Sequence, residues 1–258
     1  MSALTKDKYI IFLDIDGTVF DGKRVPARTA RALARAKAAG HKIFLNTGRA
    51  DCIVTKDIRE AVKPDGVVSA MGTAIFVGEE CIYSTYMSKA DAEFLVKFGE
   101  EADVFVIVES IERLVSMNGP AFLGQNNFID HAGELFEKYP DMNVCKVSFM
   151  QQLSEEALAP VRERFVGVYA HEGYVEIPTG TCNKATAIAR VCDYYGVGVD
   201  RTIAIGDSGN DIDMVRFAGI GVAMGNATED IKEAADFITL SCEQGGVGYA
   251  IEKLVFGE

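Results

Sequence analysis

Short apolar runs that end in a polar residue recur near both ends of the chain, and each precedes a segment with helical character. Residues 9–14 (YIIFLD) and 42–46 (KIFLN) are two such runs, and an Ala-rich segment at 27–39 lies between them. Such runs are typical of strands buried on both faces, and strand–helix–strand units build parallel sheets. The pattern therefore predicts a doubly wound α/β fold with a parallel sheet.

The same alternation predicts the remaining elements of this fold. They are a helix at 50–62, a strand at 66–70, helices at 183–195, 210–217 and 228–234, and strands at 202–206, 220–223 and 236–239. The parallel-sheet core is thus expected to consist of two segments, 1–83 and 180–258.

The intervening stretch, residues 84–179, follows another pattern. Several of its runs alternate apolar and polar residues, as VFVIVES and YVEIP do, which fits a sheet with one exposed face. We expect helices at 88–101, 127–138 and 154–162 and strands at 104–108, 113–117, 144–149, 165–170 and 174–178. The stretch is therefore predicted to form an α+β domain inserted into the core.

Composition bears on partners and on location. The formal net charge of the 258 residues is -12, and an acidic surface repels nucleic acids and anionic lipids, so we expect neither as a partner. No apolar stretch approaches the ~20 residues that span a bilayer, and the N-terminus lacks a signal-peptide pattern, so a cytoplasmic location is expected. The sequence carries no signal of oligomeric state.

The cysteines and histidines show no metal-binding spacing. None of the six cysteines forms a CxxC pair, and we predict that all are small buried side chains. They are Cys52, Cys81, Cys145, Cys182, Cys192 and Cys242.

Two aspartates lie at the end of the first predicted strand. Asp14 would be its last residue, and Asp16 lies in the turn that follows, next to Gly17. A carboxylate in the first position can attack phosphorus, and one in the second can act as general acid and base. Asp-x-Asp-Gly is also common turn chemistry, so this cluster alone leaves both interpretations open.

Further candidates follow other predicted strands or begin helices. Thr47 and Gly48 could hold an anion through a hydroxyl and loop amides, or Thr47 could only cap the next helix. Lys184 opposes the dipole at a predicted helix N-terminus, which favours an anionic partner, although a freely exposed lysine is the common case. Asp207, in GDSGNDID, offers the hard oxygen ligand that Mg²⁺ prefers. Because ligands of open parallel sheets bind at the carboxyl edge, these side chains are expected to meet there.

These motifs, in this order, give the sequence a family resemblance. It resembles the haloacid dehalogenase (HAD) superfamily of phosphohydrolases, which is marked by DxDGT, a strand-terminal Ser or Thr, a Lys and a final GDxxND. The chain carries them at 14–18, 47, 184 and 206–211. The insert, with VEIPTGTCNKATAI and the tail AIGDSGNDIDMVRFAGIGVAMGNATEDIKEAADFIT, is similar to the Cof-type branch with a type IIB cap. Cof-type members usually have Asn-Gly where this chain has Met71-Gly72, and many have Gly where it has Ala185.

The resemblance implies a Mg²⁺-dependent phosphatase of small phosphorylated metabolites, such as sugar phosphates, that works through an aspartyl phosphate on Asp14. It implies that Asp14 is nucleophile and metal ligand, and that Asp16 is general acid/base and binds the metal through its backbone carbonyl. Asp207 would also bind Mg²⁺, with Asp211 in support. It further implies that the phosphate is held by Thr47, Gly48, Lys184 and Asn210.

Other functions share some of these motifs. The resemblance also permits a sugar phosphomutase of the same superfamily, which the motifs do not exclude. A phospho-accepting signalling domain shares an Asp, a Thr and a Lys, but Asp16 and the inserted domain argue against it. GIGVAMG lacks the last Gly of GxGxxG, and the chain has no GxxxxGK[ST], which disfavours a dinucleotide site and a P-loop. The sequence does not identify the residues that set substrate specificity, and Arg24, Arg113 and Asn126 are only guesses.

Overall fold

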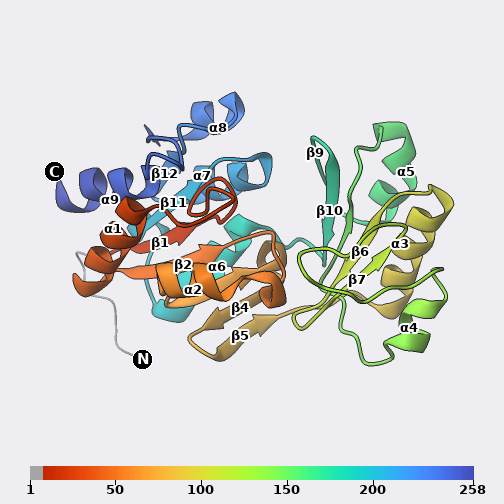
Figure 1. Ribbon diagram of the computed structural model, residues 1–258. Coiled ribbons are helices and arrows are strands. Elements are labelled where there is room, and N and C mark those ends of the chain that lie inside the picture. Colours follow the sequence, from red (N-terminus) through yellow and green to blue (C-terminus); the bar gives the residue numbers. More distant parts are fainter. Residues whose placement is uncertain (1–7) are drawn as a thin grey trace.

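The structure is a computed structural model that describes residues 8–258. It has two lobes, which Figure 1 shows side by side. The core lobe combines the two ends of the chain, and the cap lobe contains its middle part. The division of the chain at residues 84 and 179 stays a prediction.

The core is built on an eight-stranded sheet with the order β13-β12-β11-β1-β2-β3-β4-β5. Neighbours from β13 to β3 run parallel, and β4 and β5 add an antiparallel edge. The strands are β1 (Ile10–Leu13), β2 (Lys42–Asn46), β3 (Gly66–Ser69), β4 (Ala74–Val77), β5 (Glu80–Ser84), β11 (Thr202–Gly206), β12 (Ile220–Ala223) and β13 (Phe237–Ile238).

The central position of β1 follows from its composition. All four of its residues are buried, and it pairs with β2 on one side and β11 on the other, with Ile10 opposite both Lys42 and Thr202. A strand without a polar residue can only lie inside a sheet that is covered on both faces. The predicted doubly wound fold is therefore confirmed.

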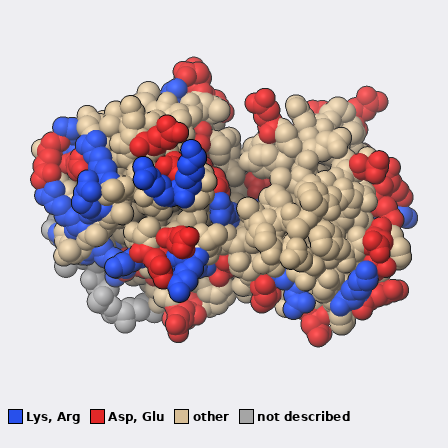
Figure 2. Space-filling view, viewed as in Figure 1, with Lys and Arg blue, Asp and Glu red and all other residues tan. Residues whose placement is uncertain are grey.

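Helices cover both faces of the core sheet (Figure 1). They are α1 (Ala27–Ala38), α2 (Lys56–Val62), α6 (Lys184–Tyr195), α7 (Ile212–Phe217), α8 (Glu229–Ala234) and α9 (Gly246–Phe256). Short 3-10 turns at Asp51–Ile53, Ala70–Gly72, Val199–Arg201 and Gly209–Asp211 complete the connections. In Figure 2 most basic side chains on the visible face lie on the core lobe, where Arg28 pairs with Glu252 and Arg35 with Glu258.

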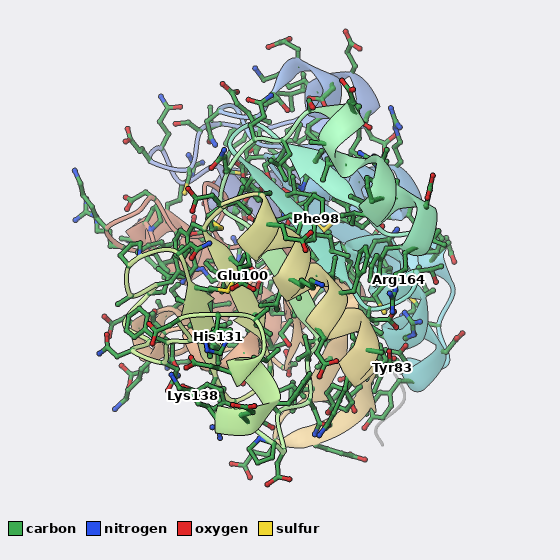
Figure 3. All side chains as sticks on the ribbon, turned by 90° about the vertical axis from the view of Figure 1, so that its right-hand side faces the viewer. Tyr83, Phe98, Glu100, His131, Lys138 and Arg164 are labelled. Atoms are coloured by element: carbon green, nitrogen blue, oxygen red, sulfur yellow. The ribbon has the colours of Figure 1, made fainter. Side chains whose placement is uncertain are left out.

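The cap is an antiparallel sheet with the order β7-β6-β8-β10-β9. Its strands are β6 (Val106–Glu109), β7 (Leu114–Met117), β8 (Lys146–Phe149), β9 (Tyr169–His171) and β10 (Tyr174–Pro178). Its helices are α3 (Lys89–Glu101), α4 (Glu134–Lys138) and α5 (Glu155–Arg164), and Figure 3 looks onto them.

The two faces of the cap sheet contact different parts of the molecule. On the helix side, Phe98 of α3 packs on Phe149 with ring centroids 5.4 Å apart, and Val106 and Val108 belong to the same buried cluster. The alternate residues Ile107 and Glu109 point the other way and line a cavity that faces the core. The predicted inserted α+β domain is confirmed as a fold, and its alternating strands place polar groups over the core.

Several predicted elements differ from the structure. The helix expected at 127–138 is reduced to Glu134–Lys138, because Phe128 bridges to Ser116 and the Ile129 N–H donates to Ser116 O. The strand expected at 165–170 is instead the short edge strand Tyr169–His171, which pairs with β10. The helix expected to start at residue 50 starts at Lys56, after a 3-10 turn.

The prediction that all six cysteines are buried is wrong for two of them. Cys145, Cys182, Cys192 and Cys242 are buried, but Cys52 is half-buried and Cys81 is exposed on β5. β5 is an edge strand, so its outward side chains meet solvent. All six are free thiols.

The search for membrane spans has a negative result within residues 8–258. There, every helix is too short or too polar to reach across a bilayer.

Candidate active site

The predicted site residues gather where the carboxyl ends of three adjacent parallel strands meet. Asp14 follows β1 and its N–H donates to Ile205 O at 3.0 Å, whereas Thr47 follows β2 and Asp207 follows β11. Residues far apart in the sequence thus share one sheet edge, as the predicted topology requires.

Lys184 is the centre of this arrangement. Its ammonium is fully buried and donates to Asp14 Oδ1 at 2.6 Å, to Asp211 Oδ1 at 2.6 Å and to Asn210 Oδ1 at 3.0 Å. Burial lowers the pKa of Lys184, but the Asp14 and Asp211 carboxylates outweigh it and raise the pKa above its usual value. A lysine in the first turn of α6 is unfavourable for the helix dipole, and the two carboxylates explain its presence.

The start of α6 is fixed by a reciprocal cap. The Asn183 side chain accepts from Thr186 N at 2.7 Å, and the Thr186 hydroxyl accepts from Asn183 N at 3.1 Å. This cap sets where the helix begins, so it sets where Lys184 enters the site.

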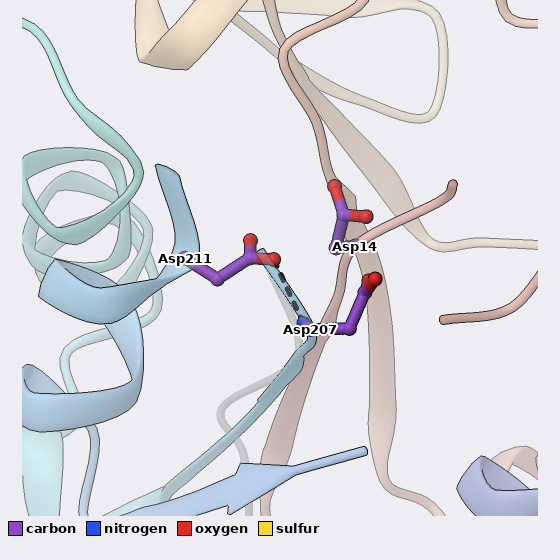
Figure 4. A group of neighbouring side chains, drawn as sticks. All are labelled: Asp14, Asp207 and Asp211. Carbon is purple, nitrogen blue, oxygen red and sulfur yellow. Dashed lines mark hydrogen bonds between the residues drawn. The ribbon is translucent and has the colours of Figure 1, made fainter. Parts of the chain in front are cut away.

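Three carboxylates can hold a cation at this edge. Oxygens of Asp14, Asp207 and Asp211 lie within 4.8 Å of one another (Figure 4). Asp211 Oδ2 already accepts from the N–H groups of Asp207 and Ser208, at 3.0 and 3.1 Å. Asp14 and Asp207 are therefore the better direct ligands, and Asp211 supports them by fixing the loop.

The electrostatics of the cluster fit a divalent cation. Burial, together with the neighbouring carboxylates, raises the pKa of Asp207 to about 6. Burial also raises the pKa of Asp14 well above its usual range, although Lys184 opposes this shift. Closely packed carboxylates are costly without compensating charge, and hard oxygen ligands of this kind suit Mg²⁺.

Two residues beside Asp14 shape the contact with Asp207. Thr18 donates from its hydroxyl to Asp207 Oδ1 at 2.8 Å. Gly17 has φ +80°, and a Cβ there would lie 2.3 Å from Asp207 Oδ2. Sequence reasoning assigned Gly17 only to a turn and gave Thr18 no role, but both contact the Asp207 carboxylate and fix its position.

Asp16 lies outside this cluster. Its side chain is 58% exposed and forms a bidentate ion pair with Arg49, with Nη2–Oδ1 at 2.5 Å and Nε–Oδ2 at 2.8 Å. Both Asp14 and Asp16 line the same cavity. Arg49, which follows the Thr47-Gly48 pair, received no function from the sequence, and only the fold shows its partner.

The cavity lies between core and cap and has a volume of about 320 Å³. The predicted phosphate-binding residues Thr47, Gly48 and Asn210 line it. The Lys184 ammonium reaches this lining through Asn210, to whose side-chain oxygen it donates a hydrogen bond. An anion bound in this cavity would meet loop amides, an amide side chain and the carboxylate of Asp14.

The cap contributes polar residues that sequence reasoning missed. They are Glu109, Lys146, Ser148, Tyr174 and Glu176. The three guessed residues, Arg24, Arg113 and Asn126, are not among those that line the cavity. A usable signal existed, because VIVES, CKVSF and YVEIP each place one charged residue within an apolar strand.

The family assignment follows from these motifs and from comparison with known proteins. The sequence profile of the haloacid dehalogenase-like hydrolases matches residues 11–251. The chain therefore belongs to this family, as predicted, and it is a Cof-type phosphatase, an enzyme that hydrolyses phosphoric monoesters.

Individual relatives cover nearly the whole chain. Bacillus subtilis YkrA is 29% identical over 261 residues, which is 96% of this chain and 98% of YkrA. The 5-amino-6-(5-phospho-D-ribitylamino)uracil phosphatase YitU of the same organism is 28% identical over 264 residues, covering 95% of this chain and 97% of YitU. The structure is similar to that of the HAD subclass IIB sugar phosphatase BT4131, with a TM-score of 0.82, 29% identity, and coverage of 95% and 98% of the two chains.

Proposed function

We propose that this phosphatase depends on Mg²⁺ and hydrolyses small phosphorylated metabolites, such as sugar phosphates, through an aspartyl phosphate on Asp14. The observation that carries the proposal is the buried Lys184, which joins Asp14 to Asp211 beside Asp207. The sugar phosphatase BT4131 and the phosphatase YitU support the substrate class as relatives.

The metal would be held by Asp14, Asp207 and the backbone carbonyl of Asp16, with Asp211 fixing the loop. When bound, Mg²⁺ would offset negative charge on the phosphoryl oxygens and on the carboxylates. Thr47, Gly48, Lys184 and Asn210 would hold the phosphate.

In the first step, an oxygen of Asp14 attacks phosphorus while the bond from phosphorus to the leaving oxygen breaks. Asp16 gives its proton to the leaving oxygen. Lys184 keeps Asp14 oriented and offsets charge on the phosphoryl group in the transition state. The bidentate ion pair with Arg49 occupies both carboxylate oxygens of Asp16. Before this step the ion pair must therefore open at one of these oxygens at least.

In the second step, water attacks the phosphorus of the aspartyl phosphate and Asp16 takes the proton of that water. The phosphorus–oxygen bond to Asp14 breaks, which releases phosphate and restores the carboxylate. The cap lies over the cavity and limits the entry of other water molecules.

We also propose that residues 84–179 act as a separable cap and that the enzyme works in the cytoplasm. Six free thiols support a reducing compartment.

Phosphate release from a panel of phosphorylated metabolites tests this function. We expect release with Mg²⁺, loss of release in EDTA, and a fall of several orders of magnitude in Asp14→Asn, as for other covalent nucleophiles. Asp193→Asn is the matched control, because Asp193 is exposed on α6. A rate in Asp14→Asn above roughly a tenth of the wild-type rate would refute the mechanism.

A further inference from the structure

Three charged residues of the cap form a buried cluster on its core-facing side. Glu109, Lys146 and Glu176 come from β6, β8 and β10 and are 3–4% exposed. Lys146 Nζ lies 3.1 Å from Glu109 Oε1 and donates to Glu176 Oε1, and Ser148 donates to Glu109 at 2.7 Å. We call these three residues the cap triad.

The cap triad touches the residues that are proposed to hold phosphate. Lys146 Nζ donates to Gly48 O at 2.7 Å, and Asn210 Nδ2 donates to Glu176 Oε2 at 3.2 Å. A Cβ on Gly48 would lie 3.0 Å from Glu176 Oε1, so the glycine leaves room for this carboxylate. A phosphate seated on Gly48 and Asn210 therefore has its ester group next to the cap triad.

The cap fold gives no reason for the cap triad. Burying three charges costs desolvation, and apolar residues of similar size commonly replace such groups without loss of stability. Apolar side chains also line the cavity, among them Ile53, Phe122, Leu123 and Met150. Charged and apolar side chains together suit a small hydroxylated molecule, because carboxylates accept from hydroxyls while carbon-bound hydrogens pack on apolar side chains.

The charge of the cap triad sets which leaving groups can bind. With both glutamates ionised, two carboxylates and one ammonium leave one net negative charge, and Lys146 already contacts both carboxylates and Gly48 O. His171 lies 3.5 Å from Glu176, and Arg49, which lines the cavity from the core side, pairs with Asp16 and not with the cap triad. A second anionic group on the substrate would thus meet carboxylates and no uncommitted cation of the cap triad.

We infer that the cap triad is the specificity site for the leaving group, and that it accepts neutral or cationic hydroxylated groups and rejects groups with a second phosphate or a carboxylate. This inference rests on the proposed phosphatase function. It adds to that function a charge rule and the residues that impose it.

The test compares three six-carbon pyranose substrates of matched shape: glucose 1-phosphate, glucosamine 1-phosphate and glucuronic acid 1-phosphate. We expect kcat/KM for the neutral and the cationic ester to exceed that for the carboxylate by about tenfold or more, since like charges at a contact repel each other. In Glu109→Gln the ratio should fall at least about threefold, because the cap triad then carries no net charge.

Controls separate this inference from the proposed function. Glu101→Gln removes an exposed cap carboxylate that pairs with the exposed Lys97, and it should keep the wild-type ratio. If Glu109→Gln does not fold, as judged by circular dichroism, the same ratio of kcat/KM values is measured in Glu176→Gln instead. Hydrolysis of p-nitrophenyl phosphate reports on the phosphatase function alone.

The outcomes are distinct. A preference for glucuronic acid 1-phosphate, an unchanged ratio in both triad variants, or hydrolysis of the aryl phosphate with none of the hexose esters would overturn the role of the cap triad. Absence of all hydrolysis, aryl phosphate included, would overturn the proposed function and the inference with it.

Discussion

Gly17 and Gly22 offer a matched test of the metal site at the scale of single residues. Both have positive φ, +80° and +88°, but only a Cβ at residue 17 would collide with Asp207. We expect Gly17→Ala to weaken Mg²⁺ activation by about 10–100-fold, the usual cost of disturbing groups that position a ligand. Gly22→Ala should show only backbone strain of about 1 kcal/mol. Titrations of the reaction rate with Mg²⁺ compare the two variants. An equal loss of Mg²⁺ activation in both would contradict the contact between residue 17 and Asp207.

The carboxylates also predict how stability responds to pH. Because the folded-state pKa of Asp207 is raised from 3.8 to about 6, its contribution to stability is present below 3.8 and is lost as pH rises through about 6. Mg²⁺ binds the deprotonated form, so the gain in Tm from Mg²⁺ should grow between about pH 5 and pH 7. Thermal unfolding at several pH values, with and without Mg²⁺, measures this gain. A gain independent of pH, or one preserved in Asp207→Asn, would show that another group binds the ion.

At this scale the sequence allowed part of the site to be predicted. Asp14, Lys184 and Asp207 occupy strand ends or a helix start, and such positions can be read from local pattern. The pairing of Asp16 with Arg49 could not be read, because it depends on how two loops approach in the fold. Each member of the cap triad could be singled out as a charged residue in an apolar strand, but their contact could not be predicted, since they lie on three different strands.

At the scale of elements, α9 is the longest element that the sequence pattern did not predict. Its segment contains Gly246 and Gly248, which lower helix propensity, yet the helix forms because it packs against α1. A Cβ on Gly248 would lie 2.9 Å from the backbone of Arg28, so the glycine permits this close packing. Tertiary packing overrides local propensity here, and the sequence pattern alone does not reveal it.

This packing gives a test. Gly248→Ala should destabilise the protein by about 1–3 kcal/mol, because the added methyl group meets rigid backbone. Gly133→Ala is the control, since its Cβ would meet only the His131 ring at 3.6 Å. Denaturant unfolding of both variants decides, and an unchanged midpoint for Gly248→Ala would mean that α1 and α9 are packed less closely than described.

At the scale of the whole molecule, the division of labour between core and cap is the main expectation. Replacing residues 84–179 by a short Gly/Ser linker should leave a folded core, because all proposed metal and phosphate ligands lie outside this stretch. The truncated protein should still gain thermal stability from Mg²⁺, and it should hydrolyse aryl phosphates slowly and without selectivity. Failure to fold would contradict the proposed boundaries.

The structure adds one consequence for this truncated protein. Ala50 and Ile53 of the core form a small apolar cluster with Ile107 and Leu114 of the cap. Removing the cap exposes the core half of this cluster and releases Gly48 and Asn210 from Lys146 and Glu176. The ratio of rates on an aryl phosphate and on the best metabolite measures what the cap contributes, and a ratio equal to that of the intact enzyme would show that it does not set specificity.

The central claim, that Asp14 carries the phosphoryl group, can be tested by chemical trapping. Asp16→Asn should slow hydrolysis of the aspartyl phosphate more than its formation from p-nitrophenyl phosphate, which has a good leaving group and needs little acid assistance. Borohydride reduces an aspartyl phosphate to homoserine, which mass spectrometry of the peptide containing residue 14 detects. We predict homoserine at position 14 only when Mg²⁺ and substrate are both present. Substrate turnover with an unmodified residue 14, or with the modification at another carboxylate, would contradict the account.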